Sequence, residues 1–244
     1  MTLQCLVSQT YSNIEIIVSD NASPSNETAR VVQEFMVKDS RIKYVRQLHN
    51  IGAIKNFQFV LAKAAGEFFM WAADDDEWDT SFIDFCIKNI GESGSIMTAF
   101  KVKNRCTNKI AMLSLPTLSG RKECHSDISA FVKNMKSSMF YGLHRRYSLS
   151  FFLTLKGFDW MDCYVCLRLI WQTGYICRND VCLYTAGIDT EKYIVKPYAN
   201  NLLNPWKYFF ISMKYILKSR NFVTFGRHFT ILFLPYVRLV FSKM

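Results

Sequence analysis

Long apolar segments are missing from this chain of 244 residues. A helix that spans a membrane needs about 18 consecutive apolar residues, and the longest apolar stretches, 208–213 and 229–237, are much shorter. The first residues also lack the basic segment and the long apolar segment of a secretory signal peptide. We therefore expect a cytoplasmic protein that crosses no membrane and keeps its eight cysteines reduced.

Acidic residues are missing from residues 192–244, which contain nine lysines and arginines. Residues 1–191 hold 21 basic and 20 acidic side chains, so the net charge of +10 belongs almost entirely to this tail. A nucleic-acid-binding protein more often carries its positive charge on the folded domain. We therefore expect no nucleic-acid partner.

The tail combines its basic residues with many aromatic and aliphatic ones. Apolar residues between 206 and 217 recur at helical spacing on one side, while Lys207, Lys214 and Lys218 fall together on another. Amphipathic helices of this kind fit an anionic membrane surface. We predict that residues 191–244 form such helices and hold the protein on the inner face of the cytoplasmic membrane. The alternative is that they pack on the rest of the protein with their basic face in solvent.

Strand and helix patterns alternate along the first part of the chain. Short apolar runs rich in β-branched residues predict strands at 14–18, 41–45 and 67–72, and helical spacing predicts helices at 24–39 and 50–65. Ser23 and Pro24 are expected to begin the first of these helices. This alternation predicts an α/β fold with a mostly parallel sheet.

The second part of the chain is expected to complete the same domain. Helices are predicted at 79–90, 126–135, 147–155 and 160–173, the last closed by Gly174, and strands within 96–113 and at 175–177 and 181–184. We expect one domain over 1–190, with halves 1–90 and 91–190, followed by the tail 191–244. Cys163 and Cys166 would suit a zinc site, but their helical, apolar surroundings favour simple packing.

Carboxylates follow two of the predicted strands. Asp20 ends the first strand, and Asp74, Asp75 and Asp76 follow the third. Ligands of parallel sheets bind beyond the carboxyl ends of the strands, and adjacent carboxylates repel one another unless a cation is bound. Mg²⁺ or Mn²⁺ would suit these oxygen ligands. The alternative is a solvated acidic turn.

Three segments in order carry a family resemblance: QTYSNIEIIVSDNAS (9–23), NIG (50–52) and AGEFFMWAADDDEW (65–78). Together they resemble the nucleotide-binding half of family-2 glycosyltransferases, most closely the abequosyltransferase-like enzymes of bacterial O-antigen or capsule synthesis. The resemblance implies a GT-A fold, which is Rossmann-like and typical of nucleotide-diphospho-sugar transferases. It also implies transfer of a sugar, with inversion, from a nucleotide-diphospho-sugar to a saccharide or polyprenyl-diphosphate-linked acceptor.

The resemblance assigns the loop after the first strand to the donor. Asp20 would contact the nucleotide base, and Asn21 would belong to the same nucleotide-sugar site. Asn50 and Gly52 would begin the helix whose N-terminus faces the phosphates. For Asn50, a helix N-cap is the alternative.

The resemblance also assigns the three aspartates. Asp74 would hydrogen-bond the ribose, Asp75 would ligate the divalent metal, and Asp76 would contact the donor sugar or support the metal ligand. Ala73 stands where many relatives carry the first carboxylate of an Asp-x-Asp motif, so the metal is assigned to Asp75 alone.

The catalytic base is expected in the second half of the domain. Relatives place an acidic residue there at the start of a helix, which implies Asp162 here, with Asp159 as the second candidate. Capping of the helix is the alternative role for both. His144 and Arg145 resemble the acceptor side of the family, although surface charge is an alternative for Arg145, and Trp160 would stack on a sugar or pack in the core.

Relatives begin with a strand that this sequence lacks. That strand would lie between the one ending at Asp20 and the one ending at Asp74, so its absence leaves two strand edges unpaired. An upstream start, a decayed fragment and a rearranged sheet are the three explanations, and we favour a shortened or mis-started sequence. A catalytically inactive subunit of a polysaccharide-assembly complex is therefore the alternative function. A nucleotidyltransferase is a further one, although no glycine-rich phosphate loop is visible.

Overall fold

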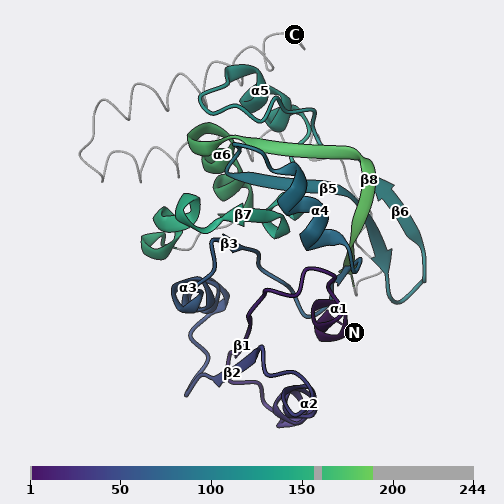
Figure 1. The fold of residues 1–244 in the computed structure, drawn as a ribbon, viewed down its shortest axis with the longest axis vertical. Helices are drawn as coiled ribbons and strands as arrows, with labels where there is room; N and C mark the ends of the chain where they lie inside the picture. The colour runs from purple at the N-terminus through teal and green to yellow at the C-terminus, as the bar shows by residue number, and fades with distance from the viewer. Residues whose placement is uncertain (1, 157–160, 189–244) are drawn as a thin grey trace.

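The computed structural model describes residues 2–156 and 161–188, and these form two separate β-sheets flanked by helices (Figure 1). The predicted tail helices of 191–244 lie outside the described residues, as do Asp159 and Trp160. The boundary between domain and tail therefore stays a prediction.

The smaller sheet pairs the first two predicted strands. β1 (Ile16–Asp20) and β2 (Ile42–Arg46) run parallel, and α2 (Glu27–Met36) connects them. Val32 of this helix packs on Ile16 and Ile42. This contact explains why the helix and both strands carry apolar residues at these positions. The helix begins later than predicted, because Asn26 and not Ser23 is its N-cap.

The larger sheet has six strands and mixed directions. Their order is β3 (Phe68–Phe69), β7 (Leu143–Arg145), β5 (Ser95–Asn104), β8 (Tyr175–Ile188) and β4 (Glu77–Trp78), with β6 (Ile110–Leu113) beside β5. Only β5 and β8 pair in parallel, and the other four pairings are antiparallel. The expectation of a mostly parallel sheet therefore holds for β1–β2 and β5–β8 but not for the sheet as a whole.

Two short strands were predicted where the structure has the single strand β8. The register against β5 jumps from Thr98↔Arg178 to Ala99↔Cys182, so residues 179–181 bulge out of the ladder. The polar residues of this bulge separate the apolar runs 175–177 and 181–184, which is why the sequence predicted two strands. Because β3 and β4 come from residues before 91 and the other strands from later ones, the two predicted halves share one sheet.

Helices and 3-10 turns cover the larger sheet and bury its core. They are α3 (Ala53–Lys63), α4 (Phe82–Asn89), α5 (His125–Lys133), η1 (Ser137–Tyr141), η2 (Arg146–Thr154) and α6 (Met161–Thr173). Trp71 stacks on Phe140 with the ring centroids 4.2 Å apart. Gln58 of α3 donates hydrogen bonds to the backbone oxygens of Phe152 (2.8 Å) and Leu155 (2.7 Å), which attaches this helix to η2.

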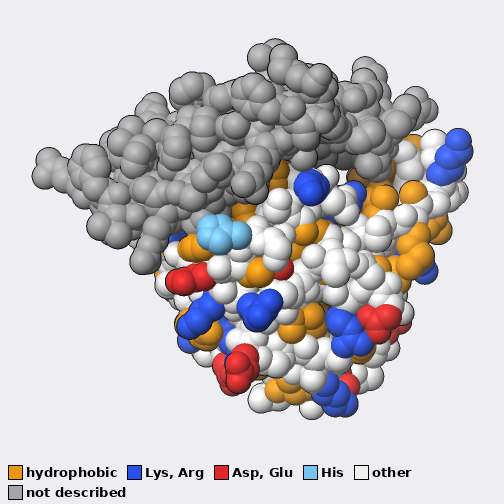
Figure 2. Space-filling model, turned by 90° about the horizontal axis from the view of Figure 1, so that it is seen from above, with side chains coloured by type: hydrophobic (Ala, Val, Ile, Leu, Met, Phe, Trp, Pro, Cys, Tyr) orange, Lys and Arg blue, Asp and Glu red, His pale blue; other side chains and the backbone are white. Residues whose placement is uncertain are grey.

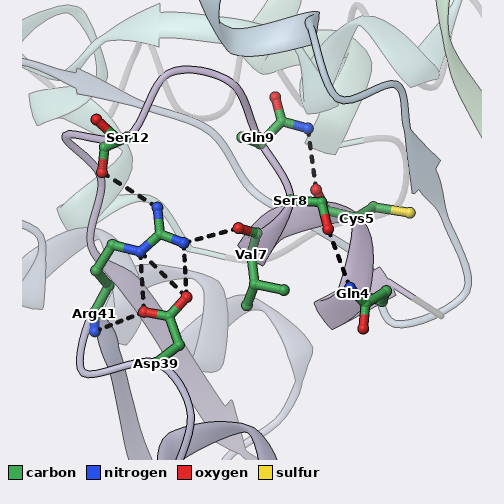
Figure 3. Close-up of polar contacts among 8 residues, drawn as sticks. All are labelled: Gln4, Cys5, Val7, Ser8, Gln9, Ser12, Asp39 and Arg41. Atoms are coloured by element: carbon green, nitrogen blue, oxygen red, sulfur yellow. Dashed lines mark hydrogen bonds and ion pairs between the residues drawn. The ribbon is translucent and has the colours of Figure 1, made fainter.

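The first helix, α1 (Thr2–Val7), and its following loop contact both sheets. Arg41 pairs with Asp39 at 2.6 Å and donates hydrogen bonds to the backbone oxygens of Val7 (2.8 Å) and Ser12 (3.2 Å; Figure 3). Gln9 donates to the backbone oxygen of Asp79 at 2.7 Å, next to α4. Within the described residues no strand pairing joins β1 to β3, where relatives are expected to carry the strand that this sequence lacks.

Acidic and basic side chains are mixed on the part of the surface that the structure describes. Figure 2 shows acidic and basic side chains interspersed on one face. Helical neighbours of opposite charge contribute to this pattern, such as Lys88 and Asp84 at 2.7 Å. No helix among residues 2–156 and 161–188 has the length and apolar character needed to cross a membrane.

Candidate active site

Asp20 ends β1 with its carboxylate turned into the protein. One oxygen accepts a hydrogen bond from the backbone N–H of Ser23 (2.8 Å), and the other accepts from the Tyr44 hydroxyl (2.9 Å) and lies 3.6 Å from Arg46 Nε. Burial alone would raise the pKa of Asp20, but these hydrogen bonds and the arginine charge outweigh it and lower the pKa. The Asp20 side chain is fully buried and closes the loop. Its predicted contact with a nucleotide base stays a prediction.

Asn21 and Asn50 meet, as the sequence predicted for a shared site. Asn21 Nδ2 donates to Asn50 Oδ1 at 3.0 Å, and Asn21 Oδ1 accepts from the backbone N–H of Ile51 at 2.9 Å. Asn50 Oδ1 also accepts from the N–H of Gly52 at 2.9 Å, the residue that begins α3 with φ +84°. The N-terminus of α3, which favours anions, therefore adjoins the carboxyl end of β1.

Asp74, Asp75 and Asp76 form a turn before β4, named here the aspartate turn. Asp74 is exposed and Asp75 is half-buried. Asp76 is buried, and its two oxygens accept hydrogen bonds from the Tyr184 hydroxyl (2.5 Å) and the backbone N–H of Gly187 (2.9 Å). Burial raises the pKa of Asp76 to about 6 in spite of these bonds. Asp76 therefore holds the turn, a position that favours its predicted support of the metal ligand over a direct contact with the donor sugar, and both roles stay predictions.

The carboxylates of the turn fit a divalent cation only in part. Among residues 2–156 and 161–188 no three His, Cys, Asp or Glu side chains cluster as a metal site. Mg²⁺ and Mn²⁺ commonly take one or two protein carboxylates and complete their coordination with substrate phosphates. Asp75, with Asp74 beside it, offers the hard oxygen donors for that arrangement, so the predicted metal role of Asp75 stays a prediction.

The zinc alternative has no support among the cysteines. Cys163 and Cys166 are buried in α6 with apolar neighbours, and none of the eight cysteines forms a disulfide. They pack as small hydrophobic residues, as the helical pattern indicated.

Asp162 lies at the start of α6, half-buried, with Oδ1 accepting a hydrogen bond from the N–H of Cys163 at 2.8 Å. Burial raises its pKa. Tyr141 links it to the aspartate turn: burial raises the pKa of Tyr141, and the charges of Asp76, Asp162 and the rest of the turn raise it further. Tyr141 ends η1, which packs on α6, and its ring centroid lies 6.4 Å from that of Tyr184, whose hydroxyl binds Asp76.

Of the two residues predicted on the acceptor side, His144 lies in the core and Arg145 forms an ion pair at the surface. His144 is fully buried, with Nδ1 2.8 Å from Ser95 Oγ and Nε2 3.0 Å from the backbone oxygen of Phe140. Arg145 pairs with Glu67 at 2.7 Å. Both stand on β7, which lies between β3 and β5. The buried ring of His144 offers no exposed surface to an acceptor, and the acceptor-side role of Arg145 stays a prediction.

Sequence reasoning missed the residues that hold the aspartate turn. Tyr184 and Gly187 bind the Asp76 carboxylate, and Thr2 and Arg105 donate to backbone oxygens of the turn. The partners are separated by between 30 and 111 positions in the chain. No local pattern could have indicated these contacts.

Comparison with known proteins places these features in a family. The sequence profile of "Glycosyl transferase family 2" matches residues 1–153. The chain is 40% identical over 76 residues to a GalNAc(5)-diNAcBac-PP-undecaprenol beta-1,3-glucosyltransferase of Campylobacter jejuni, covering 31% of this chain and 24% of that protein. It is 34% identical over 82 residues to the UDP-Glc:alpha-D-GlcNAc-diphosphoundecaprenol beta-1,3-glucosyltransferase WfaP of Escherichia coli, covering 34% and 32%. The matches thus span a third or less of these relatives.

Solved structures share the fold at low sequence identity. TarS 1–349 of S. aureus, in complex with UDP-GlcNAc, superposes with a TM-score of 0.62 at 17% identity over 80% of this chain and 56% of that chain. The mannosyltransferase PcManGT of Pyrobaculum calidifontis, in complex with GDP-Man and Mn²⁺, gives 0.54 at 16% identity over 79% and 53%. The profile match covers more than half of the chain, and the fold agrees with it. The chain therefore belongs to glycosyl transferase family 2 and has the GT-A fold.

Proposed function

We propose that this protein transfers a sugar from a nucleotide-diphospho-sugar to a saccharide or polyprenyl-diphosphate-linked acceptor, with inversion at the anomeric carbon. Its place would be the synthesis of a cell-surface polysaccharide such as O-antigen or capsule. Family membership supports the reaction class. The names of two relatives, which describe undecaprenol-diphosphate-linked saccharides as substrates, support the acceptor class.

One observation carries the proposal: Tyr141 stands on η1, which packs on α6, the helix that begins beside Asp162, and its ring centroid lies 6.4 Å from that of Tyr184, which binds Asp76 of the turn. The turn belongs to the donor side of the family resemblance, and Asp162 is the predicted base. A single inverting displacement needs these two functions near the same carbon atom, one at the leaving group and one at the attacking hydroxyl.

The donor side would be built from the turn and the start of α3. Asp75 would ligate Mn²⁺ or Mg²⁺, and Asp74, which is exposed, would contact the ribose. When bound, such a cation neutralises negative charge on a departing diphosphate. The α3 N-terminus, shaped by Asn50, Gly52 and Asn21, would favour the phosphates through its backbone N–H groups.

Asp162 would accept the proton of the acceptor hydroxyl. Burial raises its pKa, and a carboxylate with a raised pKa is a better proton acceptor near neutral pH than an ordinary one. Its hydrogen bond from Cys163 N–H is compatible with capping as well. Asp159 remains the second candidate and Trp160 a proposed sugar contact, both outside the described residues.

Thermal-shift measurements on the full chain test the donor site. UDP, UDP-glucose and UDP-GlcNAc are compared with other nucleoside diphosphates, with and without Mn²⁺. We expect Mn²⁺-dependent stabilisation that Asp75→Asn removes. Asp84→Asn, which removes a half-buried carboxylate paired with Lys88 on α4, is the matched control and should retain it.

Transfer to an undecaprenyl-diphosphate-linked saccharide is then measured for each donor that binds. Binding followed by transfer supports the proposal. Binding without transfer or donor hydrolysis favours the alternative, a catalytically inactive subunit of a polysaccharide-assembly complex. A wild-type chain that binds no nucleoside diphosphate would contradict both the donor class and the metal role.

The proposed location is the inner face of the cytoplasmic membrane, held there by the tail. The support is the sequence of residues 192–244, with nine basic and no acidic residues among many aromatic ones. Cosedimentation with vesicles rich in anionic lipid should retain the protein at low salt and release it at high salt. Failure to bind such vesicles at low salt would leave the alternative, in which the tail packs on the domain.

A further inference from the structure

We propose that Tyr184 is a positioning residue of the donor site: its hydroxyl, acting with Gly187 and Arg105, fixes the aspartate turn so that Asp74 and Asp75 face the donor. This inference rests on the proposed function, since it assigns the turn to the donor. Tyr184 stands on β8, 108 positions from Asp76 in the chain.

The side chain of Asp76 is the first point of attachment. Tyr184 Oη donates to one carboxylate oxygen at 2.5 Å, and the N–H of Gly187 donates to the other at 2.9 Å. The Tyr184 ring is buried, with its centroid 5.2 Å from that of Trp78 and 6.0 Å from that of Phe100. Because the ring is enclosed, its hydroxyl is held in one direction.

The backbone of the turn is the second point of attachment. Thr2 Oγ1 lies 2.9 Å from the backbone oxygen of Asp74 and 2.6 Å from that of Asp76. Arg105 donates from its guanidinium to the backbone oxygen of Asp75. Two carbonyl oxygens of the turn therefore share the single hydroxyl hydrogen of Thr2, and the third accepts from Arg105.

Gly187 allows the close approach of β8 to the turn. A Cβ atom at this position would lie 2.0 Å from the backbone oxygen of Asp75 and 3.1 Å from Arg105 Nε. The antiparallel pairing of Trp78 with Tyr184 fixes the register at the same place. The C-terminal end of β8 therefore packs directly against the aspartate turn and fixes its conformation.

The consequence concerns the two other carboxylates. With Asp76 turned inward and the carbonyl oxygens occupied, the exposed Asp74 and half-buried Asp75 lie on the outer side of the turn. Without the Tyr184 hydroxyl, a buried carboxylate loses a donor, and the turn must rearrange or admit water to replace it. Either change moves the proposed ribose and metal contacts.

The test compares Tyr184→Phe with Tyr175→Phe in the full chain. Tyr175 is also buried on β8, and its hydroxyl donates to the backbone oxygen of Met139, away from the turn. Both variants lose one buried hydrogen bond, so both should lose stability. Only Tyr184→Phe should speed hydrogen exchange at the amides of 73–78 and weaken UDP binding in the presence of Mn²⁺, by about tenfold.

Equal exchange and equal UDP affinity in the two variants would overturn the inference. If Tyr184→Phe does not fold, Arg105→Gln replaces it, because Arg105 binds the same turn from the exposed side. Faster exchange at 73–78 and weaker UDP binding in this variant would support the inference, and wild-type values would overturn it. Failure of the proposed function is recognised separately, because the wild type would then bind no nucleoside diphosphate. The exchange measurement needs no nucleotide and still shows whether Tyr184 holds the turn.

Discussion

The side-chain amide of Asn21 donates a hydrogen bond to the side-chain oxygen of Asn50 at 3.0 Å, across 29 positions of the chain. This contact joins the loop after β1 to the start of α3. Two bonds between Asn56 of α3 and Ser19 add to it. Asn56 Nδ2 donates to the backbone oxygen of Ser19 at 3.1 Å, and the Ser19 hydroxyl donates to Asn56 Oδ1. The helix N-terminus is therefore fixed relative to the strand end, which an anion site at this position requires.

Asn50→Ala should weaken both the fold and the donor site. It removes the acceptor of the Gly52 N–H and of Asn21, which should lower the free energy of unfolding by about 1 kcal/mol. The loosened helix start should weaken UDP binding about two- to fivefold. Chemical denaturation and calorimetric titration measure the two effects.

Asn179→Ala is the matched control for this prediction. Asn179 is an exposed asparagine that also makes two bonds with a backbone partner, Leu115, but at the bulge of β8. It should lose similar stability and keep the affinity for UDP. If Asn50→Ala binds UDP as tightly as this control, the α3 N-terminus does not contribute to the phosphate site.

Asp162→Asn should abolish the proton-accepting step. The expected loss in kcat is about 10² to 10⁴-fold, with little change in donor affinity. Because burial raises the pKa of Asp162, its basic form is lost as the pH falls through that raised pKa, so the wild-type rate should have an acidic limb above the ordinary range of a carboxyl. The pH dependence of kcat measures this limb, which the variant should lack. Wild-type-like turnover in Asp162→Asn would instead support its reading as a helix cap.

His144 should make stability depend on pH. Burial lowers its pKa to about 4 in the folded protein, whereas an unfolded histidine titrates near about 6.5. Between these two pKa values, His144 is therefore protonated in the unfolded chain and neutral in the folded protein. The resulting stability is fully present above about pH 6.5 and is lost as the pH falls through 4, up to about 3 kcal/mol.

His144→Gln isolates this contribution. Urea denaturation between pH 7 and 4 should show a smaller decline in the variant than in the wild type. His125→Gln, at an exposed histidine on α5, should keep the wild-type decline. Parallel pH curves for wild type and His144→Gln would show that the buried ring does not resist protonation.

Local patterns were sufficient to predict much of the fold. β1, β2, α3 and the β5–β6 pair follow from residue periodicity, and Gly174 ends α6 with φ +79° as predicted. The family resemblance assigned Asn21 and Asn50 to one nucleotide-sugar site, and their side chains are in contact. Such features depend on neighbours in sequence or on a repeated geometry.

Side-chain direction could not be predicted in the same way. In the sequence, Asp20 and Asp76 cannot be distinguished from carboxylates that face a ligand. In the structure, Asp20 accepts a hydrogen bond from Tyr44 and Asp76 from Tyr184, 24 and 108 positions away. His144 sits among charged residues, and its burial depends on Ser95, 49 positions distant. β4 has only two residues, which is too short for a period to be seen, and β3 covers only Phe68–Phe69 of the strand predicted at 67–72.

Two glycines with positive φ should differ in their response to alanine. Gly52 and Gly174 have φ of +84° and +79°, so Cβ strain should be similar in both. A Cβ at Gly52 would meet no atom within 4 Å, whereas one at Gly174 would lie 2.0 Å from the backbone oxygen of Gly120. Gly52→Ala should cost about 1 kcal/mol of stability, and Gly174→Ala distinctly more, about 3 kcal/mol or above.

Chemical denaturation of Gly52→Ala and Gly174→Ala gives the free energy of unfolding of each variant. The difference between the two measures the cost of close packing at Gly174, because the backbone strain is similar in both. Gly174 ends the helix that begins beside Asp162. Displacement of its backbone should therefore also lower the rate of sugar transfer. Gly52→Ala should retain most of its stability, so any loss of UDP binding there would report on the α3 N-terminus directly. Equal destabilisation by the two substitutions would mean that Gly120 moves aside and that the end of α6 is not fixed by this contact.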